Sequence, residues 1–204
     1  MANSASKMPW SDIGSEHAKG LVADCDKTSC FFRDALQGAS GGSIPNFESS
    51  NWRYEFCIFN MFWFWYVANS PKFTREGGTK PLLDAFHRGC YEAFRQTKLI
   101  DDSEDALRRW EDDVYGRFLA YKRVWDAHLA RIDDDTKGES LKMIHDSLGW
   151  HLLDYLFPSQ QPDSRVVIFL NAFGSFTFTG LVEMFTDLEK HYARAKPRWK
   201  FWSK

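Results

Sequence analysis

Apolar positions along this 204-residue chain recur mainly at steps of three and four, which is the spacing of one face of an α-helix. The clearest run lies between residues 103 and 132, where the spacing continues without interruption. Its members are Leu107, Trp110, Val114, Phe118, Tyr121, Trp125, Leu129 and Ile132. No segment shows the sustained alternation of apolar and polar residues that a half-buried β-strand requires. The pattern therefore predicts an all-α protein.

Stretches rich in Gly, Pro and Ser divide the pattern into about six predicted helices of one bundle. The predicted helices cover residues 15–37, 49–69, 79–99, 103–132, 141–156 and 165–195. Thr79 is expected to cap the third helix with Pro81 in its first turn, and Asp102 or Ser103 to begin the fourth. We expect one helical domain over residues 15–196. A flexible arm over 1–14 precedes it, and a basic aromatic tail over 197–204 follows it.

The segment EFCIFNMFWFWYVANSP, residues 55–71, is the most aromatic part of the chain. Its apolar run extends only from Phe56 to Ala68, whereas a helix needs about twenty apolar residues to cross a bilayer. A helix that is apolar on all sides and too short to span is typical of the centre of a bundle. We therefore predict that Trp63 and Trp65 belong to the core.

Residues 166–185, VVIFLNAFGSFTFTGLVEMF, are long enough to span a membrane but carry a polar group every few residues. This recurrence favours a core helix of a water-soluble bundle. A strand, or a helix broken at Gly174 or Gly180, stays an alternative because VVIFL and FTFT have β-character.

Charge is distributed unevenly along the chain. The formal net charge is −2, but residues 190–204 contain six Lys or Arg and no acid, so residues 1–189 carry −8. In the terminal segment, Arg198, Trp199 and Trp202 combine basic and aromatic side chains, which suits a membrane surface or a membrane-protein partner. Nucleic acid is disfavoured because the acidic body would repel phosphates. A tail that folds back onto the bundle is the alternative.

Signals for chemistry are weak. The four cysteines form no CxxC pair, and the N-terminal residues lack an apolar signal region, so a reduced, cytoplasmic protein is expected. His145 and His151 lie six residues apart, on different helix faces, and no zinc, nucleotide or nucleophile motif occurs. The sequence thus predicts no metal, no cofactor and no catalytic residue. An enzyme with dispersed site residues stays an alternative.

Gly116 interrupts the most regular helix, where a glycine costs about 1 kcal/mol relative to alanine. We expect this glycine to permit the close approach of a neighbouring helix. We also expect Arg117 to pair with Asp113, four residues earlier on the same face.

Three segments follow one another in an order that resembles the ubiquinol–cytochrome c chaperone family. They are residues 52–69 (WRYEFCIFNMFWFWYVAN), 83–97 (LDAFHRGCYEAFRQT) and 114–125 (VYGRFLAYKRVW). The family's "YGR…AY" helix has its counterparts here in Tyr115, Gly116, Arg117, Ala120 and Tyr121. The resemblance covers residues 52–130, and it implies a non-enzymatic helical protein that binds a membrane-embedded client during respiratory-complex assembly.

The first functional hypothesis is accordingly a helical interaction protein, including an assembly chaperone for a membrane-protein client, peripheral at a membrane. It predicts an exposed apolar groove of several hundred Å². Its expected partner-binding residues are Tyr115, Arg117, Tyr121, Arg198, Trp199 and Trp202. The alternative hypothesis is a binder of a small apolar ligand, a lipid or pigment, in a cavity lined by Phe59, Trp63 and Phe173.

Overall fold

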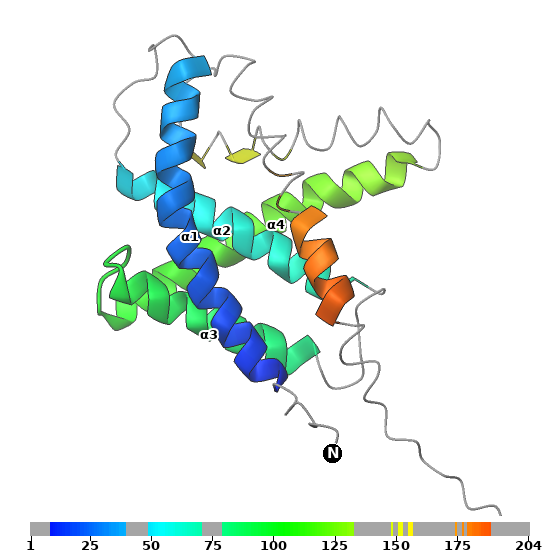
Figure 1. Cartoon of the computed structure of the whole chain (residues 1–204), viewed down its shortest axis with the longest axis horizontal. Helices are drawn as coiled ribbons and strands as arrows, with labels where there is room; N and C mark the ends of the chain where they lie inside the picture. The colour runs from blue at the N-terminus through cyan, green and yellow to red at the C-terminus, as the bar shows by residue number, and fades with distance from the viewer. Residues whose placement is uncertain are drawn as a thin grey trace, which may run out of the picture.

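The computed structural model describes residues 9–39, 49–70, 79–132 and 179–188, together with residues 148, 151, 152, 155, 156, 174 and 177 (Figure 1). Its four long helices are α1 (Trp10–Ala39), α2 (Ser49–Ala68), α3 (Thr79–Gln96) and α4 (Glu104–Ile132). Residues 179–188 form a further helical segment. The part of the chain that the structure describes is 91% helical and has no strand, which confirms the predicted all-α class.

Five helices are counted in that part, where the sequence predicted about six. The difference concerns the predicted helix over residues 141–156. Its described residues (148, 151, 152, 155 and 156) are all helical, but its bounds lie outside the described residues. The described residues between 174 and 188 are helical as well, so the alternative of a strand is not found there.

Helix α2 is the centre of the bundle, with α1, α3 and α4 all packed against it (Figure 1). Every residue from Phe56 to Phe64 is buried, on all sides of the helix. Trp63 is completely buried, and its ring meets Trp125 of α4 edge to face at 5.3 Å between centroids. Trp65 is partly buried and packs on Phe118 of α4. The prediction of a central core helix is therefore confirmed.

Helices α1 and α3 approach each other through residues without bulk. A Cβ atom on Gly14 would overlap the carbonyl oxygen of Leu82, and one on Gly89 would lie 2.8 Å from the Cβ of Ala18. Both positions must therefore remain glycine for the two backbones to keep this separation. Gly116 has no such role, contrary to the prediction, because it is exposed and a Cβ there would meet no atom within 4 Å.

The start of α1 also differs from the prediction. The helix begins at Trp10, so residues 10–14 of the predicted flexible arm are helical. The carbonyl oxygen of Pro9 accepts hydrogen bonds from the backbone N–H groups of Asp12 and Ile13, at 3.0 and 3.1 Å. Ile13 is buried against the core. Contact with α3, far away in the sequence, stabilises this first turn, whose own apolar pattern is weak.

Local signals set the other helix ends as expected. Helix α3 begins at Thr79, and Ser103 precedes α4 and accepts a hydrogen bond from the N–H of Ala106 at 3.1 Å, as an N-cap does. Helix α3 ends in a Schellman arrangement, in which the N–H of Leu99 donates to the carbonyl of Phe94 at 2.9 Å. Lys98 takes the left-handed conformation there, with φ of 57°.

Within the described ranges, no helix combines the length and the apolar character that crossing a membrane would demand.

Candidate functional site

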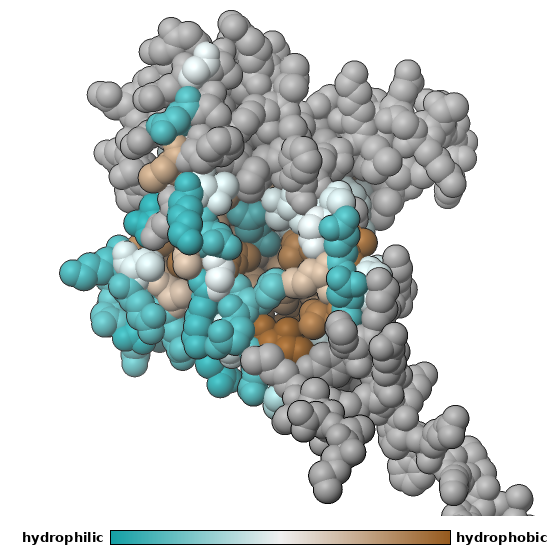
Figure 2. All heavy atoms as spheres, viewed as in Figure 1, coloured by the Kyte–Doolittle hydropathy of each residue, from teal (hydrophilic) through white to brown (hydrophobic). Residues whose placement is uncertain are grey.

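A groove opens between α1, α2 and the segment that contains residues 174–188. Its volume is about 330 Å³, and we call it the α1 groove. Figure 2 shows the hollow between α1 and residues 179–188, with apolar side chains inside it and polar ones along the α1 side. The volume lies at the lower end of the range of small-molecule pockets, and the shape suits one bulky side chain of a partner equally well.

The α1 side of the groove consists of two neighbouring rows of residues spaced four apart. The inner row is His17, Leu21 and Cys25, and the outer row is Glu16, Gly20, Asp24 and Thr28. Residues four apart lie on one face of a helix, so each row runs along α1. The inner row provides apolar contact area, while the outer row places two carboxylates at the rim with a glycine between them.

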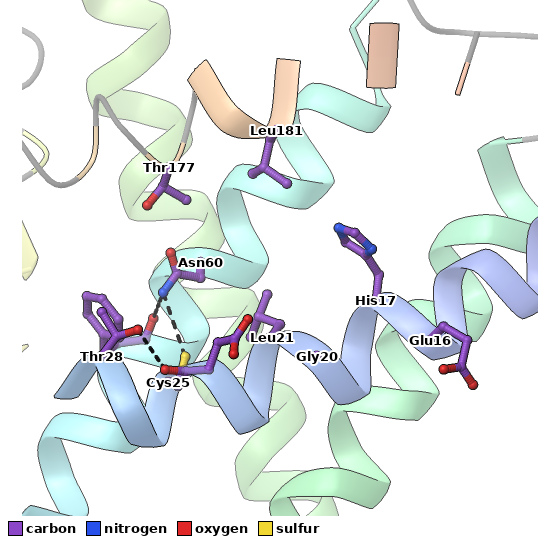
Figure 3. Close-up of a pocket in the computed structure, with 11 residues that line it drawn as sticks. Glu16, His17, Gly20, Leu21, Cys25, Thr28, Asn60, Thr177 and Leu181 are labelled. Carbon is purple, nitrogen blue, oxygen red and sulfur yellow. Dashed lines mark hydrogen bonds between the residues drawn. The ribbon is translucent and has the colours of Figure 1, made fainter. Parts of the chain in front are cut away.

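Phe56 and Asn60 of α2 also line the groove, as do Thr177 and Leu181. Figure 3 shows Asn60, Thr177 and Leu181 across the groove from α1. Asn60 is 7% exposed, which makes it one of two buried polar residues among those described. Its amide nitrogen donates to the carbonyl of Phe56 at 3.0 Å and approaches the Cys25 sulfur at 3.7 Å. The amide oxygen points the other way, toward Thr177 (Figure 3), and is therefore a hydrogen-bond acceptor that faces the groove.

His17 contributes an uncharged ring to the groove. Burial lowers the pKa of His17 below its ordinary value of 6.5, because a partly buried imidazolium would lose hydration. The ring lies 5.2 Å from that of Phe64, centroid to centroid. Among the described lining residues, the charged groups are therefore Glu16 and Asp24, and both are acidic.

The arrangement does not assemble a nucleophilic enzyme site at the groove. Cys25 and His17 are eight residues apart on α1, which separates their backbones by about 12 Å along the helix. A thiol and its general base must be within hydrogen-bond reach, about 3 Å. Across the described residues, no group of three or more His, Cys, Asp and Glu side chains is placed to hold a metal ion.

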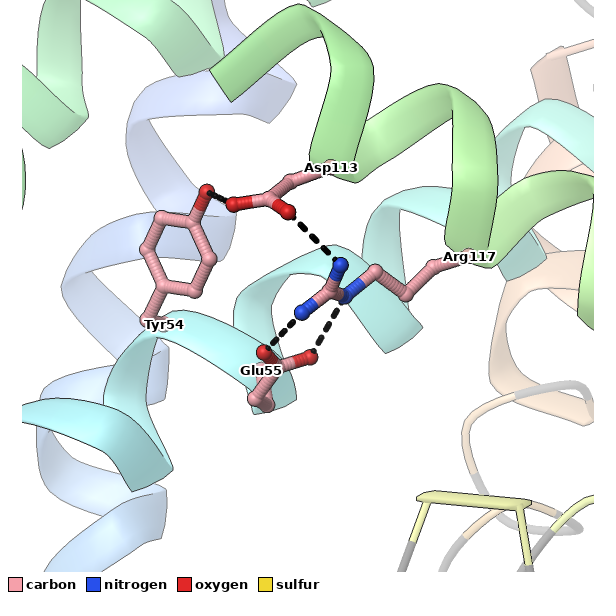
Figure 4. Close-up of polar contacts among 4 residues, drawn as sticks. All are labelled: Tyr54, Glu55, Asp113 and Arg117. Atoms are coloured by element: carbon pink, nitrogen blue, oxygen red, sulfur yellow. Dashed lines mark hydrogen bonds and ion pairs between the residues drawn. The ribbon is translucent and has the colours of Figure 1, made fainter. Parts of the chain in front are cut away.

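A second polar site joins α2 to α4 (Figure 4). The Arg117 guanidinium donates to both carboxylate oxygens of Glu55, at 2.6 and 3.0 Å, and to Asp113 at 2.7 Å. The Tyr54 hydroxyl donates to the other oxygen of Asp113 at 2.8 Å. Tyr155 covers the guanidinium, 4.5 Å from its ring centroid. We call Tyr54, Glu55, Asp113 and Arg117 the α2–α4 network.

Burial and hydrogen bonding shift the pKa values of two of these groups. Burial, with the hydrogen bond to Asp113 second, raises the pKa of the Tyr54 hydroxyl. Burial by itself lowers the pKa of Arg117, but the hydrogen bonds and charges of Glu55 and Asp113 outweigh it and raise the pKa. The Tyr54 hydroxyl therefore stays protonated and the Arg117 guanidinium stays charged at physiological pH. The predicted pair of Arg117 with Asp113 is confirmed, and Glu55 is the partner that the sequence did not indicate.

The predicted partner-binding residues of α4 do not share one surface. Tyr115 is 67% exposed, whereas Tyr121 is completely buried and Arg117 is engaged in the network. The Tyr121 hydroxyl has no hydrogen-bond partner among the described residues, and burial raises its pKa. A partner can therefore reach the ring of Tyr115 in this structure but not that of Tyr121. Arg198, Trp199 and Trp202 lie outside the described residues.

Where the structure describes the predicted ligand cavity, protein atoms fill the space around Phe59 and Trp63. Phe59 and Trp63 are 1% and 0% exposed. A Cβ atom on Gly174 would lie 3.6 Å from the Phe59 ring and 3.9 Å from Trp63 Nε1, so the chain at Gly174 covers both rings. Phe173 lies outside the described residues. The α1 groove instead uses Phe56 and Asn60, from neighbouring turns of α2.

Comparisons of the chain with protein-family models, with curated proteins and with solved structures gave no match in any of the three. The resemblance of residues 52–130 to the ubiquinol–cytochrome c chaperone family therefore stays a prediction.

Proposed function

We propose that the protein is a non-enzymatic helical interaction protein that receives an apolar side chain of a partner in the α1 groove. The observation that carries this proposal is the combination of an apolar floor (Leu21, Cys25 and Phe56) with an open mouth at Gly20. A single bulky side chain inserted into such a hollow is a common anchor in protein recognition.

A pair of glycine variants tests this proposal. Gly20 and Gly116 are both exposed helix positions where a Cβ atom would meet nothing within 4 Å. Gly20→Leu would fill the mouth of the groove, while Gly116→Leu makes the same chemical change on α4. Both changes replace glycine by a better helix former, so both proteins should fold.

The measurement is quantitative mass spectrometry of proteins that co-purify with the wild type and the two variants. We expect one set of partners to fall at least tenfold with Gly20→Leu and to remain with Gly116→Leu. Equal recovery in all three proteins would refute binding through the groove. Loss in both variants would place the interaction elsewhere.

The finer form of the proposal is an assembly chaperone for a membrane-protein client, cytoplasmic and peripheral at a membrane. The sequence resemblance supports it, as does the basic, aromatic composition of residues 190–204. Replacement of Trp199 and Trp202 by alanine should reduce co-sedimentation with anionic liposomes several-fold. Unchanged co-sedimentation would remove the membrane component but leave partner binding intact.

Binding of a small apolar ligand is a second candidate function, favoured by the Asn60 oxygen that faces the groove (Figure 3). A ligand with an apolar body and one hydrogen-bond donor would satisfy this acceptor. Native mass spectrometry of the purified protein should then show an additional bound mass, absent from Gly20→Leu. A single unliganded mass would exclude a tightly bound endogenous ligand.

A further inference from the structure

The charge around the α1 groove limits what can bind in it. Glu16 and Asp24 are the charged groups among the described residues that line it. Asp24 has no salt bridge with a described residue, and Glu16 contacts Lys19 at 3.1 Å in an ion pair whose side chains are 67% and 61% exposed. Exposed ion pairs of this kind contribute little to stability, so Glu16 can readily exchange Lys19 for another cation. The rim therefore favours an occupant that carries positive charge beside an apolar group.

The spacing of the rim is a second restriction. Glu16 and Asp24 are eight residues apart on α1, which places them about 12 Å apart along the helix axis. An extended chain advances about 3.3 Å per residue, so two basic residues four positions apart would match both carboxylates. The side chain that enters the groove must lie between these two basic residues.

The chain itself contains a segment with this composition and spacing. Lys196 and Lys200 are four positions apart, with Arg198 and Trp199 between them. We infer that residues 196–202 of the C-terminal tail occupy the α1 groove of the same molecule, with Trp199 over the apolar floor and the lysines at Glu16 and Asp24. This inference rests on the proposed function, since it takes the groove to be a docking site.

The tail is long enough to reach the groove. Leu181 lines the groove, and the helical segment that contains it continues to residue 188, seven residues or about 10 Å further along the helix. The eight residues from 188 to Lys196 can extend over about 26 Å, more than the return distance requires. Because the tail is tethered, its effective concentration is in the millimolar range, so modest contacts suffice for docking.

An occupied groove would make the tail a competitor of the partner. A partner, or an anionic membrane that attracts residues 190–204, would have to displace the tail before the groove is free. Docking of the tail and partner binding are then mutually exclusive at one site.

Zero-length crosslinking of the full chain tests this placement directly. A water-soluble carbodiimide joins a carboxylate to a lysine amine only when the two are in contact. We expect isopeptide links from Glu16 or Asp24 to Lys196 or Lys200 in the wild type, identified by mass spectrometry of proteolytic fragments. Their yield should fall at least tenfold in Gly20→Leu and in Trp199→Ala, and stay unchanged in Gly116→Leu.

Three results would overturn the inference. The first is that the tail lysines link to other carboxylates and not to the groove. The second is that the links persist unchanged in Gly20→Leu. The third is that they join light to heavy chains when ¹⁴N- and ¹⁵N-labelled proteins are mixed, since the tail of a second copy would then be the occupant. Circular dichroism of each variant confirms that the helices are retained.

Failure of the inference is distinguishable from failure of the proposed function. Without groove links, partner loss in Gly20→Leu would still establish the groove as a docking site. With groove links but no partner loss, the tail would be the occupant of a groove that no partner uses.

Discussion

The contacts of α1 with α3 and of α2 with α4 solve the problem of packing two helices in opposite ways. Between α1 and α3, Gly14 and Gly89 bring the backbones together and leave no room for a Cβ atom. Between α2 and α4, large rings fill the space and Arg117 bridges the helices through Glu55. The contact of α1 with α3 depends on glycines that have no side chain, and the contact of α2 with α4 depends on a partner for each buried charge.

Different mutations should therefore destabilise the two interfaces. An added methyl group should destabilise the contact of α1 with α3, while removal of one charge should destabilise the contact of α2 with α4.

Replacement of Arg117 by alanine should lower the free energy of unfolding by about 3–5 kcal/mol, measured by urea denaturation. The reason is that Glu55, whose side chain is 9% exposed, would keep a buried charge without a partner. Lys122→Ala is the control, because it breaks an exposed pair with Asp126 and should cost under about 1 kcal/mol. If both variants lost the same small amount, the network would not hold α2 and α4 together.

Replacement of Gly14 by alanine should cost about 2–3 kcal/mol, since the new methyl group would overlap the backbone of Leu82. Gly20→Ala on the same helix is the matched control. A Cβ atom there meets nothing within 4 Å, so that variant should gain about 0.5–1 kcal/mol from helix propensity. A gain at Gly14 as well would mean that α1 and α3 are further apart than the structure places them.

Stability should also fall as the pH drops below about 6.5, the ordinary pKa of histidine. Burial lowers the pKa of His17, which packs on α2, and of His87, which packs on Trp110 of α4, although Glu111 and Asp84 partly offset the shift of His87. Between the lowered pKa and 6.5 the unfolded chain binds more protons than the folded chain, so the free energy of unfolding falls as the pH drops through this window. The contribution of the neutral histidines is fully present above pH 6.5 and is lost once the pH is below the lowered pKa.

The slope is at most about 1.4 kcal/mol per pH unit for each histidine. Denaturation midpoints at pH 7.5 and 5.5 measure it, and the double variant His17→Gln, His87→Gln should flatten the difference. An unchanged slope in the double variant would assign the effect to other groups.

Replacement of Tyr121 by phenylalanine should change stability by less than about 1 kcal/mol. Its buried hydroxyl has no hydrogen-bond partner in the part of the chain that the structure describes, so phenylalanine would lose no bond seen there and would remove a desolvation cost. Tyr121→Ala should instead cost about 3–5 kcal/mol through the cavity it leaves. A large loss with phenylalanine would show that the hydroxyl is bonded in solution.

The sequence predicted those parts of the fold that depend on local pattern. The apolar row of α4 was correct from Leu107 to Trp125, because burial of one helix face appears directly as a spacing of three and four. The central place of α2 followed from a run that is apolar on every side. Asp102 or Ser103 was predicted to begin α4, and Ser103 is its cap, since a cap depends on neighbouring residues alone.

The predictions that failed depend on contacts between distant segments. The start of α1 and the role of Gly116 required knowledge of which helices meet. Gly14 and Gly89 are the glycines at a close approach, and nothing in the sequence around them distinguishes them from the exposed Gly116.

The α1 groove was not predicted, because its walls come from three separate segments and none of the predicted site residues lines it. One signal was present in α1, where Glu16, Gly20 and Asp24 run beside His17, Leu21 and Cys25 at the same spacing. A glycine between two acids on the exposed row indicates a place where the helix surface carries no side chain and a partner can approach.

The burial of α2 on all sides has a consequence for the synthesis of the protein. The chain leaves the ribosome from its N-terminus, so α2 is complete at residue 68, while α4 is complete only at residue 132. At about 5–20 residues per second, the aromatic rings of α2 wait roughly 3–13 s for their partners. During that interval the rings of α2 lack the α4 side chains that cover them in the folded protein, so slower translation of α3 and α4 should increase aggregation of the newborn protein.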